Sequence, residues 1–76
     1  MSEESQMIHM LVRITRLAAK RWHMKLSHAA TFLGTSGALG YVARNFALFH
    51  MEGDDAVLDD VEDYLAMRGM TPHVAS

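Results

Sequence analysis

The sequence contains no cysteine, so neither disulfide bonds nor thiolate metal sites can stabilise the fold. It also has no apolar run of about 18 residues, the length that a membrane-spanning helix requires. Its start, MSEESQ, is acidic and polar, whereas a signal peptide starts with basic and then apolar residues. A cytoplasmic protein without a membrane segment is therefore expected.

The 76 residues are enough for one small domain, and half of them are apolar. Because a small protein has little interior, part of this apolar surface is expected to contact another chain. The formal net charge of −2 argues against a protein that binds nucleic acids or membranes in a general way.

No segment alternates apolar and polar residues for long enough to predict a β-strand, and helical periodicity dominates. The prediction is an all-α fold, a compact single domain of four helices over 3–23, 27–35, 37–45 and 54–68. Ser2, Ser27 and Asp54 are the expected N-caps, and Gly37 and Gly69 have the structural role of ending helices. An apolar connector is expected over 46–53 and a loose tail over 70–76.

The first expected helix has an unusually wide apolar surface. Its apolar residues spread over about 220° of the helix, more than one small core can cover. We therefore expect a homodimer, with a self-complementary contact made by the following residues: Met7, Met10, Leu11 and Ile14.

A basic stripe of Arg13, Arg16 and Lys20 runs along the rest of this helix. A solvent-exposed face is the simplest interpretation of these side chains. Pairing with an acidic surface and contact with nucleic acid phosphates are the alternatives.

Acidic residues crowd the last expected helix. Asp54 and Asp55 suit a helix N-terminus, and Asp59, Asp60, Glu62 and Asp63 fall opposite its apolar face. The DDVED run also copies the DDxxD pattern by which isoprenoid synthases bind magnesium, but such enzymes need a large cavity that this chain cannot build. We expect no catalytic residue, metal or cofactor, and interpret Asp55, Asp59, Asp60 and Asp63 as a candidate surface for a partner.

The histidines lack the spacing of a metal site. His23 and His28 are five positions apart across an expected helix break, and no HExxH motif occurs. His50 lies in the apolar connector, where its ring could bond a backbone carbonyl or a carboxylate, so a structural role is expected.

The segment from Leu26 to Gly69 resembles a short bacterial family known only as a domain of unknown function. The similarity lies in an LS entry, a GxLxYV helix, FH before the acids, and DDVxxY before a final glycine. The positions that carry it are Leu26, Ser27, Phe32, Gly37, Leu39, Tyr41, Val42, Phe49, His50, Asp59, Asp60, Val61, Tyr64 and Gly69. The resemblance implies genes that often neighbour those of ADP-ribosyltransferase-like toxins, and hence an antitoxin or accessory module.

The leading functional hypothesis is a non-enzymatic interaction module that partners the product of a neighbouring gene, with its acidic last helix against a basic cleft. The alternative is a small dimeric nucleic-acid-binding regulator that uses the basic stripe. An enzyme would have to act through Asp59, Asp60 and His50.

Overall fold

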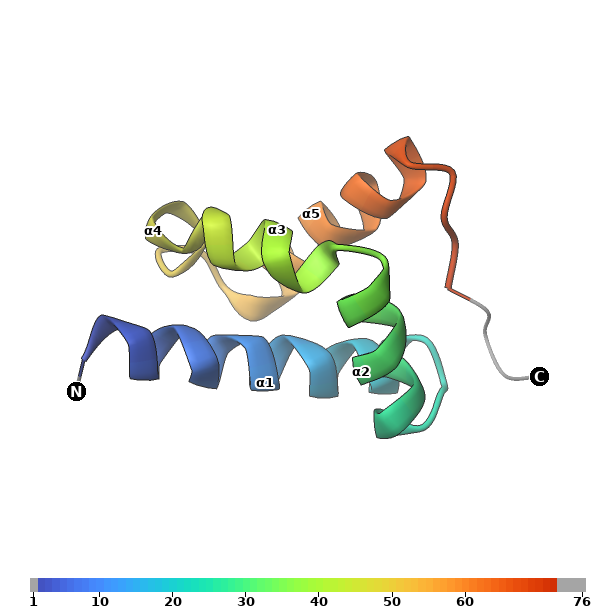
Figure 1. Ribbon diagram of the computed structural model, residues 1–76, viewed down its shortest axis with the longest axis horizontal. Helices are drawn as coiled ribbons and strands as arrows, with labels where there is room; N and C mark the ends of the chain where they lie inside the picture. The colour runs from blue at the N-terminus through green and yellow to red at the C-terminus, as the bar shows by residue number, and fades with distance from the viewer. Residues whose placement is uncertain (1, 73–76) are drawn as a thin grey trace.

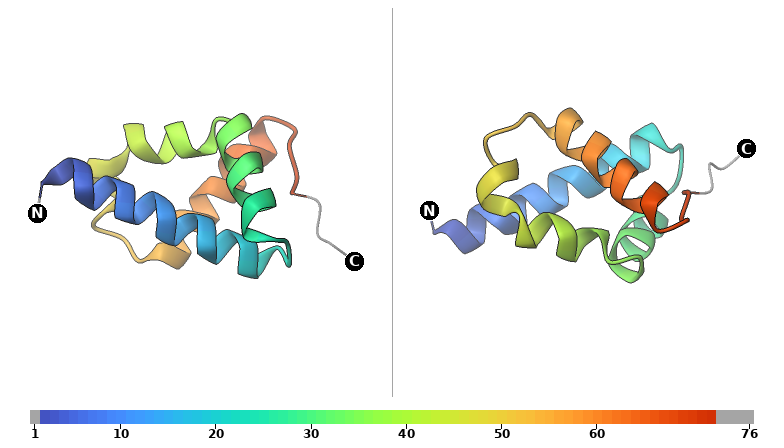
Figure 2. Two further views of the ribbon diagram at one scale, coloured as in Figure 1. Left: turned by 60° about the horizontal axis from the view of Figure 1, so that its bottom comes forward. Right: turned by 90° about the horizontal axis from the view of Figure 1, so that it is seen from above.

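The computed structural model describes residues 2–72, and within that range the chain forms helices joined by short turns and loops, with no strand. Five helices follow one another along the chain: α1 (Glu3–Arg21), α2 (Leu26–Thr35), α3 (Ala38–Arg44), α4 (Phe46–Phe49) and α5 (Asp54–Met67). Helix α1 runs along the molecule, α3 to α5 lie on one side of it, and α2 crosses near its C-terminal end (Figures 1 and 2). The fold is thus a compact all-helical domain.

Both ends of α1 follow from local sequence. Ser2 is the N-cap, and its Oγ accepts a hydrogen bond from the N–H of Ser5 at 3.2 Å, which confirms the expected cap. At the other end, the N–H of Met24 donates to the carbonyl of Ala19, and His23 takes a left-handed conformation with φ +54°. This is a Schellman motif, and it ends α1 two residues before the expected position.

The expected connector over 46–53 contains a fifth helix, α4, which the four-helix prediction missed. The carbonyl of Asn45 accepts hydrogen bonds from the N–H groups of Leu48 and Phe49, which closes one helical turn. Phe46 and Phe49 are buried, so packing holds a turn that is too short to be stable alone.

Two expected caps differ in the structure. Helix α2 starts at Leu26, so Ser27 lies inside its first turn and makes no capping bond. Helix α5 has Gly53 as its N-cap, and Asp54 is its first residue. Asp54 instead accepts a hydrogen bond from Arg13 of α1, a partner that no local pattern could indicate.

The core lies between α1 and the other helices, and it contains part of the expected dimer surface. Met10 and Ile14 are 2% and 0% exposed, so they cannot contact a second copy. Met7 and Leu11 are half-buried and pack against the same core. The expected interface is therefore corrected at Met10 and Ile14, which belong to the core, whereas Met7 and Leu11 remain partly exposed.

Apolar side chains do remain outside on α1, at Ile8 and Val12, which are 50% and 42% exposed. On α2, Ala29 is buried and Ala30 is exposed. Met67 is also exposed, although the periodicity of α5 places it with the apolar residues.

The C-terminal end of α5 has a second Schellman motif. Gly69 has φ +70°, and the N–H of Met70 donates to the carbonyl of Leu65 at 2.8 Å. Met70 packs against the core, so the expected loose tail is anchored at its first residue. Residues 73–76 of that tail lie outside the described residues. No helix within 2–72 combines the length and apolar character needed to cross a membrane.

Candidate interaction surface

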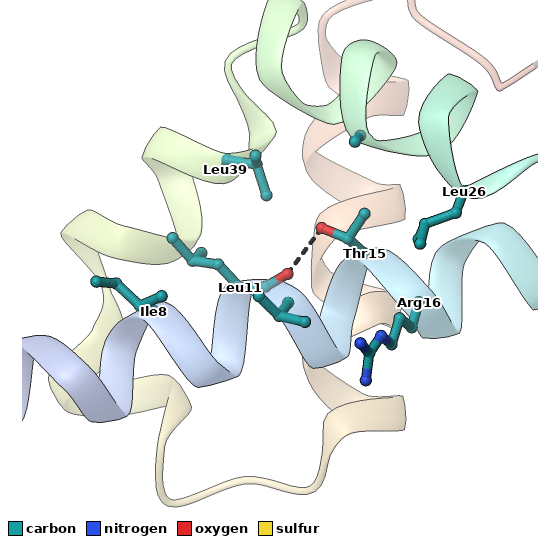
Figure 3. Close-up of a pocket in the computed structure, with 8 residues that line it drawn as sticks. Ile8, Leu11, Thr15, Arg16, Leu26 and Leu39 are labelled. Carbon is teal, nitrogen blue, oxygen red and sulfur yellow. Dashed lines mark hydrogen bonds between the residues drawn. The ribbon is translucent and has the colours of Figure 1, made fainter. Parts of the chain in front are cut away.

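An open apolar groove of about 320 Å³ lies where α1, α2 and α3 meet (Figure 3). Helix α1 forms its floor, and Leu26 of α2 and Leu39 of α3 stand on its walls. Six of its lining residues are apolar, and the other two are Thr15 and Arg16. The full lining is Ile8, Leu11, Val12, Thr15, Arg16, Leu26, Ala30 and Leu39.

The spacing of residues on α1 explains the floor of the groove. Ile8, Leu11, Val12 and Thr15 are separated by three or four positions and share one face. The hydroxyl of Thr15 donates to the carbonyl of Leu11 at 2.7 Å, so its polar group is satisfied within the helix. The floor therefore offers little polarity to a ligand.

The turn between α2 and α3 brings the two walls together. Gly37 has φ +88°, a left-handed conformation that suits glycine, and it connects the end of α2 to the start of α3. Leu39 follows in the first turn of α3 and is half-buried against the core. The groove is thus an outward continuation of the core.

Sequence reasoning missed most of this surface. The wide apolar arc correctly indicated a further apolar surface on α1. Of the four residues expected there, Leu11 lines the groove, whereas Met10 and Ile14 are buried and Ile8 and Val12 are exposed instead. Leu26 and Leu39 come from other helices, and no periodicity within α1 could place them beside it.

Part of the basic stripe is engaged in an ion pair within the chain. Nε of Arg13 donates to the carboxylate of Asp54 at 3.1 Å, whereas Arg16 lines the groove and Lys20 is exposed. Among the described residues, the ion pairs involve Arg13 and Arg21 but neither Arg16 nor Lys20.

Arg21 binds much of the acidic face of α5. Its guanidinium donates to Asp59 at 2.7 Å, to Glu62 at 2.9 Å and, more weakly, to Asp55 at 3.4 Å. The hydrogen bond to Asp59 is the largest cause of a raised pKa for Arg21, opposed by burial. Two of the four acids expected to meet a partner, Asp55 and Asp59, are therefore engaged within the chain.

The other two acids, Asp60 and Asp63, lie on the side of α5 that faces Tyr41. Burial raises the pKa of Tyr41, and the negative charges of Asp60 and Asp63 raise it further. The ring of Tyr41 stacks on Tyr64 with centroids 4.4 Å apart and meets Phe49 edge-on at 5.5 Å. These acids border an aromatic cluster that joins α3 to α5.

The ring of His50 contacts a backbone carbonyl, one of the two kinds of contact expected for it. Its Nδ1 lies 3.0 Å from the carbonyl of Phe46, and its ring stacks on the ring of Phe46 at 5.2 Å. Because the carbonyl can only accept, Nδ1 carries the hydrogen. His50 also borders a polar hollow of about 390 Å³ between α1 and α4, with Gln6, His9 and Arg13. Over residues 2–72, no three or more histidine or carboxylate side chains gather to hold a metal.

Comparison with known proteins identifies a family but no relative of known activity. Neither the curated proteins nor the solved structures contain a match to this chain. The family model described as "Protein of unknown function (DUF3791)" matches residues 9–68, which include α2 to α5 and most of α1. The chain therefore belongs to the DUF3791 family of proteins of unknown function.

Proposed function

We propose that this protein is a non-enzymatic interaction module that binds a polypeptide helix in the groove of α1, α2 and α3. The observation that carries the proposal is the exposure of Ile8, Val12 and Leu26, at 42–51%, around one apolar hollow. Covering each of these half-exposed side chains contributes about 1 kcal/mol.

The shape of the groove favours a helix as its occupant. From Ile8 to Arg16 its floor extends for about 12 Å along α1, which corresponds to two turns of a bound helix. An amphipathic helix places apolar residues at three- and four-residue spacing into such a groove. Arg16 at the edge favours an occupant with a carboxylate beside its apolar stripe.

The acidic face of α5 supports a partner less well than the groove does. Arg21 already engages Asp55 and Asp59, so a basic cleft on another protein would have to displace it. Asp60 and Asp63 remain as the acids available to a partner encoded by a neighbouring gene, such as a toxin.

The nucleic-acid-binding alternative also has weaker support. Arg13 is held by Asp54, which leaves Arg16 and Lys20 of the basic stripe for phosphates. Two cations on a chain of net charge −2 provide little of the phosphate neutralisation on which such binding depends. No specific observation favours this function over the groove.

A matched pair of variants tests the proposed function. Val12→Asp puts a charge in the groove, and Leu48→Asp makes a similar change at an exposed leucine of α4, outside it. Tagged chains are expressed in the native host beside the untagged chain, and the proteins that co-purify are quantified.

Polypeptides that bind the wild-type and Leu48→Asp chains, including the untagged chain itself, are expected to be lost from the Val12→Asp chain. If the Val12→Asp chain retains every polypeptide that the other two bind, the groove is not the interaction surface. Circular dichroism of both variants checks that the helices are intact.

A further inference from the structure

The groove is bordered by one row of α1 side chains that are all exposed. Taking every fourth residue, the row reads Glu4, Ile8, Val12 and Arg16. Such rows are the ridges by which helices pack against one another. An acid stands at one end, a base at the other, and two apolar residues lie between them.

We propose that a second copy of this chain occupies the groove, with the two α1 helices antiparallel about a two-fold axis level with the midpoint between Ile8 and Val12. The inference rests on the proposed function and names its partner. In this register Ile8 lies beside Val12 of the second copy, and Glu4 lies beside its Arg16. The two-fold axis repeats both contacts, so the row is complementary to itself.

The charges at the two ends of the row favour an antiparallel over a parallel arrangement of the two α1 helices. In a parallel pair, Glu4 would meet Glu4 and Arg16 would meet Arg16, which places like charges together. In the antiparallel pair both meetings are between opposite charges. Glu4 and Arg16 of one chain are about 18 Å apart along α1, so they cannot bond each other within it.

Within the described residues, neither Glu4 nor Arg16 forms an ion pair. The ion pairs there join Arg13 and Arg21 to α5 and involve neither Glu4 nor Arg16. Arg16 lies at the edge of the apolar floor, where a carboxylate of an incoming helix would arrive (Figure 3).

The geometry of ridge packing also places the second helix over the rest of the groove. Rows of this type interdigitate when the helix axes are inclined by about 50°. A helix that crosses α1 at this inclination leaves the row toward the side of Leu26 and Leu39 at one of its ends. The contact therefore covers part of the hollow as well as the exposed row.

Sedimentation equilibrium of the purified full chain tests whether the partner is a second copy. The wild-type and Leu48→Asp chains are expected to be dimers, and Val12→Asp should weaken the association about 100-fold, because it places an unpaired charge in the apolar contact. Ile8→Asp is an independent variant of the same surface. The inference would be overturned if the wild-type chain stays monomeric. It would also be overturned if neither Val12→Asp nor Ile8→Asp weakens the dimer.

Charge reversal tests the antiparallel register. Glu4→Arg and Arg16→Glu each turn two attractive pairs per dimer into repulsive ones, so each should weaken self-association about tenfold. A mixture of the two variant chains contains only opposite-charge pairs and should form a heterodimer of wild-type strength. A mixture that associates no better than either variant alone overturns the register.

The sedimentation and co-purification experiments together separate the two proposals. A purified chain that is monomeric, but whose binding of another protein is lost with Val12→Asp, removes the second copy as occupant and leaves the proposed function standing. Loss of both would remove the groove as an interaction surface.

Discussion

The indole N–H of Trp22 donates a 2.8 Å hydrogen bond to one carboxylate oxygen of Glu62, while Arg21 bonds the other oxygen at 2.9 Å. Two consecutive residues at the end of α1 are thus tied to one side chain of α5. Trp22 is 3% exposed, so its N–H has little access to water as a replacement.

Glu62→Ala is expected to lower the free energy of unfolding by about 1–3 kcal/mol, because it leaves the buried indole N–H without an acceptor. Glu62→Gln keeps an acceptor and should cost less. Urea denaturation followed by the fluorescence of Trp22, the only tryptophan, measures both. Asp63→Ala, at an exposed position of the same helix, is the control, and an equal loss there would contradict the assigned role of Glu62.

His23→Gly is expected to raise the free energy of unfolding by about 0.5–1 kcal/mol. His23 has φ +54° at the end of α1, a conformation that costs most residues energy but suits glycine. His28→Gly makes the same chemical change inside α2, where it should be destabilising by about 0.5–1 kcal/mol. Thermal unfolding of both variants measures the difference, and effects of the same sign would contradict the prediction.

Gly37→Ala is expected to destabilise the fold for two separable reasons. The residue has φ +88°, and a Cβ there would lie 3.0 Å from the hydroxyl oxygen of Tyr64. The backbone conformation alone costs about 1–2 kcal/mol. Tyr64→Phe removes the close atom, so Gly37→Ala should cost less by about 0.5–1 kcal/mol in that background.

Chemical denaturation of the four chains of this double-mutant cycle separates the two contributions. A cost that is the same in both backgrounds would show that the Tyr64 hydroxyl does not restrict Gly37. The backbone cost is expected to remain in either case.

The raised pKa of Tyr41 predicts a pH dependence at the alkaline end. Because the folded pKa lies above the ordinary value of about 10, the folded state holds this proton more tightly than the unfolded state. This stabilisation is complete below pH about 10 and is lost as the pH rises through the folded pKa.

Absorbance titration of the Tyr64→Phe variant measures Tyr41 directly, because Tyr41 is then the only tyrosine. Asp60→Asn in that background should lower the pKa of Tyr41, since it removes a nearby negative charge. An unchanged titration would contradict the assigned influence of Asp60.

Several helix ends could be predicted from the sequence because they depend on local interactions. Ser2 caps α1 and Gly69 ends α5 because each effect depends on atoms within a few residues along the chain. The position of α4 was not readable in the same way. Its single turn depends on burial of Phe46 and Phe49 against helices elsewhere in the chain.

The wide apolar arc of α1 was also visible in the sequence, as was the need for a further contact surface. Which of its residues stay exposed was decided only by the packing of the other helices, which buries Met10 and Ile14 and leaves Ile8 and Val12 exposed. All four are apolar residues of one helix, so periodicity alone cannot tell which of them are buried and which are exposed.

Charge pairing was decided by the tertiary structure as well. Arg13 meets Asp54, 41 positions away, and Arg21 meets Asp59, 38 positions away. The sequence by itself determined the four longer helices, α1, α2, α3 and α5, and the excess of apolar surface, because both depend on neighbours along the chain. The groove and the engaged charges depend on neighbours in space, which only the packed fold brings together.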